Sequence, residues 1–302
     1  MMEKSLPTTY KSGFVAVMGR PNVGKSTLVN ALIGQKIAAV SPRPQTTRKR
    51  QLGILSLEDA QIVFVDTPGV HFPHHKLGEA MNQEALQVLQ ECDLILFIAD
   101  LSQPPNDEDR LLSGLLAKVH RPTPRLLVLN KTDLVAAGEQ ADLQAQFQAL
   151  LPEAELLAVS ARSGLGLDRL LARLQALLPE GQPFFPEDQM TDFFERDIAA
   201  DLIRAAALNL LRDEVPHGIA IRIDEFSERP QGGAFIAATL FVERESHKGI
   251  VIGQAGAMLK QIGTAARREI EAMSGRKVYL QLRVKVRQNW RNDEKVLKWF
   301  GY

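Results

Sequence analysis

Short apolar runs alternate with segments of helical periodicity through the first 178 residues of the chain. The runs are typical of buried parallel strands, and the segments between them repeat apolar residues at a spacing of three or four. Strands are predicted at 14–18, 61–65, 94–99, 125–129 and 156–159, and helices at 25–33, 111–119, 143–151 and 167–178. This alternation predicts an α/β domain whose mostly parallel sheet has helices on both faces.

A different order of elements follows residue 178. Residues 179–186 hold three prolines and a glycine, which is typical of a linker. Beyond them the pattern predicts a helix near 193–211, strands at 219–226 and 235–242, a short helix, a helix through 258–270 and a strand at 278–286. We therefore predict two domains, 1–179 and 187–302, joined by a Pro-rich linker at 180–186, with an α+β fold in the second.

Composition and charge narrow the class of protein. The chain has 302 residues and one cysteine, Cys92, which excludes an internal disulfide and favours a packing role in a cytoplasmic protein. No apolar run approaches the ~18–20 residues that span a bilayer. The net charge is zero, yet residues 187–243 carry 5 Lys/Arg against 12 Asp/Glu, and residues 244–302 carry 13 against 5. The basic region favours a phosphate-bearing partner, with a solvated charged face as the alternative.

The first predicted strand leads through a glycine loop into a helix. This context is the one that a phosphate-binding loop requires, because consecutive N–H groups and the helix N-terminus attract an anion. Lys25 is expected to reach the β- and γ-phosphates, and the Ser26 hydroxyl is expected to ligate Mg²⁺. An ordinary Gly-rich turn is the alternative. The predicted phosphate-binding residues are Gly19, Arg20, Pro21, Asn22, Val23, Gly24, Lys25, Ser26 and Thr27.

A second loop follows the strand at 61–65. Asp66 stands where a carboxylate can hold Mg²⁺ through water, and the Gly69 N–H can contact the γ-phosphate. The same tetrapeptide is also a common turn, but its place after a strand and downstream of Lys25 favours the site. This predicted γ-phosphate loop consists of Asp66, Thr67, Pro68, Gly69 and Val70.

A third loop follows the strand at 125–129 and reads Asn130-Lys-Thr-Asp133. An Asp carboxylate accepts hydrogen bonds from the N1–H and the exocyclic amine of guanine, whereas adenine would leave it unpaired. Asn130 is expected to contact N7 and to tie loops together, and the stem of Lys131 can lie along the base. After the next strand, Ser160 and Ala161 fit a loop whose N–H contacts guanine O6. These motifs predict a site for GTP and GDP.

The order of these motifs resembles that of translation-factor-class GTPases. The segments PNVGKSTLVN, DTPG and NKTD are similar to those of bacterial Era-type assembly GTPases. The resemblance implies that switch I lies in the Pro-rich segment 41–48, at Gln45, Thr46 and Thr47. Thr47 is favoured over Thr46 to complete the Mg²⁺ shell with Ser26 and Asp66. A purely structural loop is the alternative.

Hydrolysis without help is expected to be slow. Val70 and His71 follow Gly69, where Ras-like enzymes have the Gln that orients the attacking water. We hypothesise that Asn22 helps to hold K⁺ in place of an arginine finger. The alternative is that Asn22 only shapes the loop.

In the second half, an apolar run and a GxxG sequence separate two predicted helices. The order helix-strand-strand-helix-helix-strand resembles the type II KH domain, in which the two glycines let the backbone clamp about four nucleotides of single-stranded RNA. The predicted RNA-binding residues are Lys248, Ile252, Gly253, Gln254, Ala255, Gly256 and Lys260. Trp290 and the aromatic residues at 299–302 either dock on this domain or stack on bases.

Together the two halves resemble the Era family. The resemblance implies a monomer that binds 16S ribosomal RNA near its 3′ end, assists assembly of the 30S subunit and also touches the inner membrane peripherally. We expect GTP to gate RNA binding, so that each ligand changes the affinity for the other equally. The alternatives are a membrane-associated regulatory GTPase that binds anionic lipid, and an adaptor that binds protein. A tRNA-modification GTPase would need a long N-terminal domain, and about a dozen residues precede the first strand.

Overall fold

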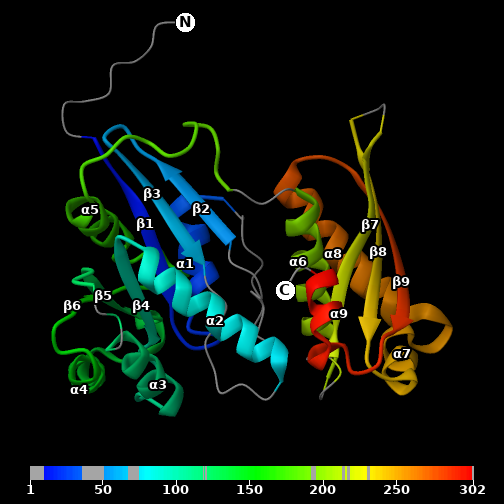
Figure 1. The fold of residues 1–302 in the computed structure, drawn as a ribbon, viewed down its shortest axis with the longest axis horizontal. Coiled ribbons are helices and arrows are strands. Elements are labelled where there is room, and N and C mark those ends of the chain that lie inside the picture. Colours follow the sequence, from blue (N-terminus) through cyan, green and yellow to red (C-terminus); the bar gives the residue numbers. More distant parts are fainter. Residues whose placement is uncertain are drawn as a thin grey trace, which may run out of the picture. The chain divides into compact units, whose positions relative to one another are not determined.

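The structure is a computed structural model (Figure 1). It describes residues 10–35, 51–66, 75–117, 119, 121–191, 195–212, 215, 218–229 and 232–300. These residues form two compact units, one built on a six-stranded sheet and the other on a three-stranded sheet.

The first unit has the predicted α/β order. Its sheet has the strand order β2-β3-β1-β4-β5-β6, in which only β2 runs antiparallel to its neighbour. The strands are β1 (Lys11–Met18), β2 (Gln51–Ser56), β3 (Ala60–Asp66), β4 (Leu94–Asp100), β5 (Arg125–Asn130) and β6 (Glu155–Ala158). The helices are α1 (Lys25–Ile33), α2 (Lys76–Glu91), α3 (Asp107–Leu116), η1 (Thr132–Leu134), α4 (Ala137–Leu150) and α5 (Leu167–Leu177).

Both faces of this sheet are buried, which explains why its strands read as continuous apolar runs. Ala16 and Met18 of β1 pack in a core cluster to which α2, α3 and α4 contribute side chains. The alternate residues of the strand, Val15 and Val17, are fully buried as well. Since side chains alternate between the faces of a strand, α1 and α5 cover the second face.

Three elements of this unit were missing from the sequence prediction: the short helix η1, strand β2 and helix α2. Strand β2 is short, contains Gly53 and pairs antiparallel with β3 at the edge of the sheet. Helix α2 buries Ala85, Val88 and Leu89 in the core of this unit, but polar residues are interspersed along the helix. Both β2 and α2 depend on long-range packing more than on a strong local pattern.

The single cysteine has the structural role that we predicted. Cys92 is buried in the core of the first unit. Burial raises the pKa of its thiol to about 11. The thiolate is therefore scarce at neutral pH, so this cysteine is poorly reactive.

The segment that we predicted as a linker lies along the first unit. The Gln61 side chain accepts hydrogen bonds from the N–H groups of Phe184 and Phe185 and donates one to the Phe185 carbonyl. Farther along, Thr191 forms a bridge with Gly53 of β2. This part of the chain is therefore held by specific contacts, and the predicted domain limits of 1–179 and 187–302 stay a prediction.

The second unit is an α+β fold. Its sheet has the order β7-β8-β9, with β7 antiparallel and β9 parallel to β8. The elements are α6 (Glu195–Leu210), β7 (Ala220–Glu228), β8 (Ala234–Val242), α7 (Glu245–Ile252), η3 (Gln254–Gly256), α8 (Ala257–Ser274), β9 (Val278–Val286), η4 (Trp290–Asn292) and α9 (Glu294–Phe300). Apart from α9, which was not predicted, this is the order expected for a type II KH fold.

The core of this unit lies between the sheet and helices α6 and α8, which pack against each other (Figure 1). The described part of the chain contains no helix that is long and apolar enough to cross a membrane. Of the two roles considered for Trp290, docking is the one observed. Its ring is fully buried, and its Nε1–H donates to the Gly218 carbonyl at 2.9 Å.

Candidate nucleotide and RNA sites

The predicted nucleotide-binding residues meet at the carboxyl ends of the parallel strands in the six-stranded sheet. Strands β1, β3, β4, β5 and β6 run parallel, so their carboxyl ends lie on the same side. Open α/β sheets bind ligands at the carboxyl ends of their strands, because the loops that leave the strands are free to converge there.

Two glycines of the phosphate-binding loop are required by close contacts. A Cβ on Gly19 would lie 2.3 Å from the carbonyl oxygen of Ile98, and a Cβ on Gly24 would lie 2.3 Å from Nδ2 of Asn130. Gly24 also has a φ of 100°, and Asn22 between them has a φ of 66°. Helix α1 begins directly afterwards with no acidic residue in its first turn. The positive end of its helix dipole can therefore attract an anion.

Lys25 folds back over this loop. Its Nζ donates to the carbonyls of Gly19 at 2.9 Å and Arg20 at 3.1 Å. Burial lowers the pKa of Lys25 to about 8, although the carboxylate of Asp66 opposes the shift. Bound phosphates would favour the ammonium form, so they should raise this pKa.

This shift predicts that nucleotide affinity depends on pH. Below about pH 8 the free protein already carries the Lys25 charge, whereas above it binding must take up a proton. We expect affinity for GDP to be constant at low pH and to fall by up to about tenfold per pH unit above pH 8. Titration of a fluorescent GDP analogue from about pH 6 to about pH 9 measures this. In a Lys25→Arg control, whose guanidinium stays protonated, only titration of the nucleotide itself remains, namely of its terminal phosphate at about pH 6 and of its base at high pH. An identical pH profile in both proteins contradicts the prediction.

Two of the three predicted Mg²⁺ ligands lie in the described part of the chain, and they are neighbours. The Ser26 hydroxyl donates to Oδ2 of Asp66 at 2.8 Å. One hydroxyl and one carboxylate form a small oxygen donor set, and Mg²⁺ sites of this kind are completed by phosphates and water. The donors therefore fit Mg²⁺. The third predicted ligand, Thr47, lies outside the described residues, together with Gln45 and Thr46.

The γ-phosphate loop also falls largely outside the described residues. Of its predicted members only Asp66, at the end of β3, is described, and it is buried. Thr67, Pro68, Gly69 and Val70 lie outside. Their roles, like those of the switch I residues, stay predictions.

Asn130 joins the phosphate loop to the guanine loops, as its predicted role requires. Its Nδ2 donates to the Val23 carbonyl at 2.8 Å, and its Oδ1 accepts from the Ala161 N–H at 2.9 Å. The side chain is almost completely buried. One amide group thus holds three loops from β1, β5 and β6 at fixed distances.

Asp133 has a partner that the sequence prediction did not assign. The Ser160 hydroxyl donates to Oδ1 of Asp133 at 2.6 Å. The sequence predicts only that the Ser160 loop contacts the base through its main chain, whereas in the fold its side chain also orients the carboxylate. A hydroxyl and a carboxylate far apart in sequence carry no local signal of such a contact.

A carboxylate outside the motifs holds Lys131. Nζ of Lys131 lies 2.6 Å from Oδ2 of Asp100, the last residue of β4. Burial opposes ionisation of Asp100, but hydrogen bonds from Lys131 and Ser102 outweigh it and hold the pKa of Asp100 below its usual range. Asp100 follows an apolar strand run, which is a signal that could have drawn attention to it.

The side chain of Arg20 also contacts Asp100, together with a second carboxylate, Asp109. Its guanidinium lies 3.3 Å from Asp109 and 3.9 Å from Asp100. Arg20 thus takes part in the loop through its main chain, and its side chain forms an ion-pair network with β4 and α3. This network connects the phosphate loop with Lys131 of the guanine loop.

The second unit presents the predicted GxxG loop between α7 and α8. Gly253, Ala255 and Gly256 have φ values of 70°, 48° and 80°. A Cβ on Gly253 would lie 2.8 Å from Cβ of Met258, whereas a Cβ on Gly256 would meet nothing within 4 Å. Gly253 therefore serves local packing, and Gly256 faces open space where a ligand can approach its backbone.

A groove of about 430 Å³ begins at Gly256. Lys260 lines it, and so do residues that were not predicted, among them Gly263 of α8 with Leu280 and Leu282 of β9. Among the other predicted residues, Lys248 lies 3.5 Å from Glu245, one turn earlier in α7. Sequence alone did not indicate the strand side of this groove.

Comparisons with known proteins identify a matching family for each half of the chain. A family described as "50S ribosome-binding GTPase" matches residues 14–131, and one described as "KH domain" matches residues 214–291. The chain is 45% identical over 292 residues to the GTPase Era of Heliobacterium modesticaldum, covering 97% of both proteins. It is 46% identical over 294 residues to the GTPase Era of Geobacter metallireducens, covering 97% of this chain and 98% of that protein.

Two solved structures match nearly the whole chain. A crystal structure of Era in complex with MgGDPNP and nucleotides 1506–1542 of 16S ribosomal RNA matches with a TM-score of 0.91 and 40% identity, covering 97% of this chain and 99% of that one. A single-substitution variant of Aquifex aeolicus Era bound to GDP·AlF₄⁻ matches with a TM-score of 0.90, 39% identity and the same coverage.

The two folds and the loops at the sheet edge define a P-loop GTPase with a C-terminal KH domain. At this level of identity over nearly its full length, the chain belongs to the Era family of GTPases. It is therefore an enzyme that hydrolyses GTP to GDP and phosphate.

Proposed function

We propose that this chain is a GTP-controlled switch that binds 16S ribosomal RNA near its 3′ end and assists maturation of the 30S subunit. The observation that carries the proposal is the joint presence of the loop set around Asn130 and an open GxxG groove in one chain. The Era structure with a 16S fragment, which this chain matches along its length, supports the choice of RNA.

Within the first unit we assign the roles by contact. Lys25 and the N-terminus of α1 hold the phosphates, and Ser26 and Asp66 hold Mg²⁺, the metal that accompanies GDPNP in the matching Era complex. Asp133, oriented by Ser160, selects guanine. When bound, Mg²⁺ neutralises charge that develops on the phosphate oxygens. Asn22 remains our candidate for a K⁺ ligand.

The second unit holds RNA through its GxxG loop. The positive φ of Gly256 and the free space around it let a phosphate approach the backbone, while Lys260 supplies charge. The apolar surface of Leu280 and Leu282 lies in the same groove and suits base faces. The charge of residues 244–302 has the sign that such a ligand needs.

Gly256→Asp tests this assignment. A carboxylate at the mouth of the groove repels phosphate, and we expect RNA affinity to fall by about tenfold or more, equivalent to about 1.4 kcal/mol. Binding of an RNA covering the 3′-terminal segment of 16S ribosomal RNA is measured by fluorescence anisotropy. Gly256 is preferable to Gly253, whose substitution would also disturb Met258.

Gly34→Asp is the matched control. Gly34 ends α1 with a φ of 77° and open space around it, so the variant has the same charge and similar backbone strain. It belongs to the first unit and does not line the groove. We expect it to keep the affinity of the original protein. Equal losses in both variants, or no loss in Gly256→Asp, would argue against RNA binding at the GxxG loop.

A further inference from the structure

The groove at the GxxG loop continues into a second cavity at its far end. This cavity has a volume of about 560 Å³, within the range of ~300–1,000 Å³ common for ligand sites. Arg267 and Tyr279 line both the groove and the cavity. A strand of RNA that leaves the groove along α8 and β9 would therefore pass directly into the cavity.

The cavity combines cationic groups with an accessible aromatic ring. Arg229, Arg267 and Lys277 line it, and none of the three forms an ion pair with another described residue. Its acidic member, Glu271, accepts a hydrogen bond from the Val278 N–H at 3.0 Å. The balance of charge favours an anion.

Tyr279 provides a platform that is already assembled. Its ring is stacked on Phe235 of the neighbouring strand, with centroids 5.7 Å apart and planes inclined by 19°. The Arg229 guanidinium lies 4.9 Å from the Tyr279 centroid and 5.6 Å from that of Phe235. These contacts limit the freedom of the ring, so binding costs little further entropy.

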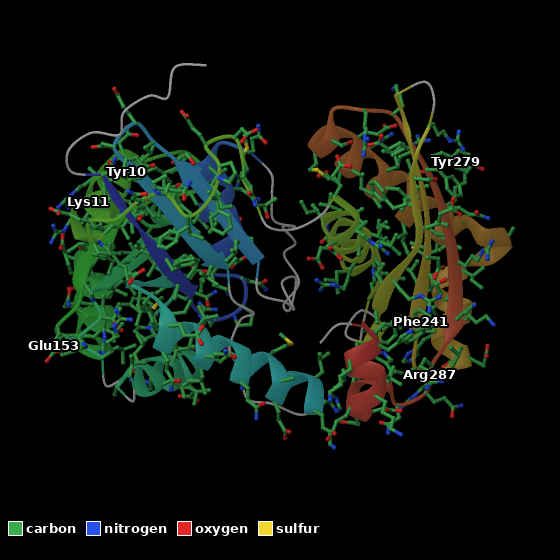
Figure 2. All side chains as sticks on the ribbon, turned by 45° about the horizontal axis from the view of Figure 1, so that its top comes forward. Tyr10, Lys11, Glu153, Phe241, Tyr279 and Arg287 are labelled. Carbon is green, nitrogen blue, oxygen red and sulfur yellow. The ribbon has the colours of Figure 1, made fainter. Side chains whose placement is uncertain are left out.

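One side of the Tyr279 ring remains available. β9 is the last strand of the described sheet, so Phe235 lies on one side of Tyr279 and no described strand on the other. Tyr279 is 56% exposed even though its ring contacts Phe235 and Arg229. Figure 2 shows Tyr279 at one end of this sheet, far from Phe241 at the other.

We propose that this cavity is a base-stacking subsite for one nucleotide of single-stranded RNA beyond the four held at the GxxG loop. The base extends the Phe235–Tyr279 stack, and Arg267 and Lys277 contact the adjoining phosphates. The proposal rests on the RNA-binding function proposed above. Base-on-aromatic stacking tolerates any base, so the subsite adds affinity and length preference more than sequence preference.

The test compares RNA fragments of different length. Fragments of the 3′-terminal segment of 16S ribosomal RNA are shortened one nucleotide at a time from each end, and each affinity is measured for the original protein and Tyr279→Ala. We expect equal affinities for the shortest bound fragments. Once a fragment is long enough to reach the cavity, the RNA affinity of the original protein should rise by about 5- to 150-fold, whereas that of Tyr279→Ala should not rise. Tyr279→Phe keeps the ring and should keep the gain.

A second pair of variants tests the phosphate contacts. Lys277→Gln should reduce the salt dependence of binding, lowering the log–log slope by about 0.7, for the long fragments only. Lys285→Gln is the control, because Lys285 is an exposed lysine of β9 about 25 Å farther along the chain. It should leave the slope unchanged.

The outcomes separate the two proposals. Equal affinities of Tyr279→Ala and the original protein at every length overturn the subsite, and so does a loss of equal size at every length, which would place Tyr279 within the four-nucleotide clamp. The RNA-binding function would still stand in both cases. If the original protein binds none of the fragments, both proposals fail.

Discussion

Replacing Asp133 with asparagine is expected to lower affinity for GTP by about 10²- to 10⁴-fold and to raise affinity for xanthosine triphosphate. The carboxylate can accept from both the N1–H and the exocyclic amine of guanine, and each charge-assisted bond contributes about 1.5–3 kcal/mol. An amide keeps one acceptor but turns an N–H donor towards the amine, so two donors face each other. Xanthine has a carbonyl in place of that amine and would pair with the amide.

The contacts of Asp133 indicate that the substitution should change base recognition without displacing the loop. The new amide would keep an oxygen that can accept the Ser160 hydroxyl, which lies 2.6 Å from Oδ1 of the present carboxylate. The loop should therefore remain in place. Isothermal titration with GTP, xanthosine triphosphate and ATP measures all three affinities at one Mg²⁺ concentration.

Asp142→Asn removes the same charge from an exposed position on α4 and should change none of these affinities. An Asp133→Asn variant that binds GTP within about threefold of the original protein, a difference of less than about 1 kcal/mol, would show that this carboxylate does not select the base. In that case the assignment of the guanine loops would be wrong, whatever the other loops contribute.

Trp290→Ala is expected to destabilise the second unit by about 3–5 kcal/mol, the range found for removal of a fully buried large aromatic side chain. Trp290 is the largest fully buried side chain described. Its ring meets Phe300 edge-on at 5.3 Å between centroids. Truncation leaves a cavity and also leaves the Gly218 carbonyl without the N–H that now lies 2.9 Å away.

Urea unfolding followed by tryptophan fluorescence measures this effect in the second unit alone. The chain contains two tryptophans, and both lie beyond residue 286. In Trp290→Ala the signal comes from Trp299, and in the control Trp299→Ala it comes from Trp290. Trp299 is 49% exposed but its ring contacts Phe241 and Arg222, so its removal should cost about 1–2 kcal/mol, less than removal of Trp290. Equal costs for the two variants would contradict the docking role of Trp290.

The elements that could be predicted are those whose residues carry strong local patterns. The strands of the parallel sheet are buried on both faces, so nearly every residue in β4 or β5 is apolar and the run is visible without context. β2 and α2 lack such a signal. β2 depends on its antiparallel pairing with β3, and α2 depends on the sheet surface that its few apolar residues cover.

The GxxG loop illustrates the same limit within one motif. The two glycines of the motif look equivalent in the sequence. In the fold, Gly253 is packed against Met258, while Gly256 faces the groove. The order of elements predicts that the loop is a nucleic-acid clamp, but the surroundings of its two glycines differ because Met258 of α8 fills the space beside the first.

The amino-acid sequence by itself determined the class of this protein: its phosphate and guanine motifs, their order after strands, and the change to a KH order of elements after residue 178. These features are local, because a motif carries its chemistry in consecutive residues. Only the tertiary structure decided that Ser160 contacts Asp133, that Asp100 holds Lys131, and that Tyr279 lines the groove beside the GxxG loop. Each of these contacts joins residues far apart in the chain, and their distances depend on how strands and helices pack.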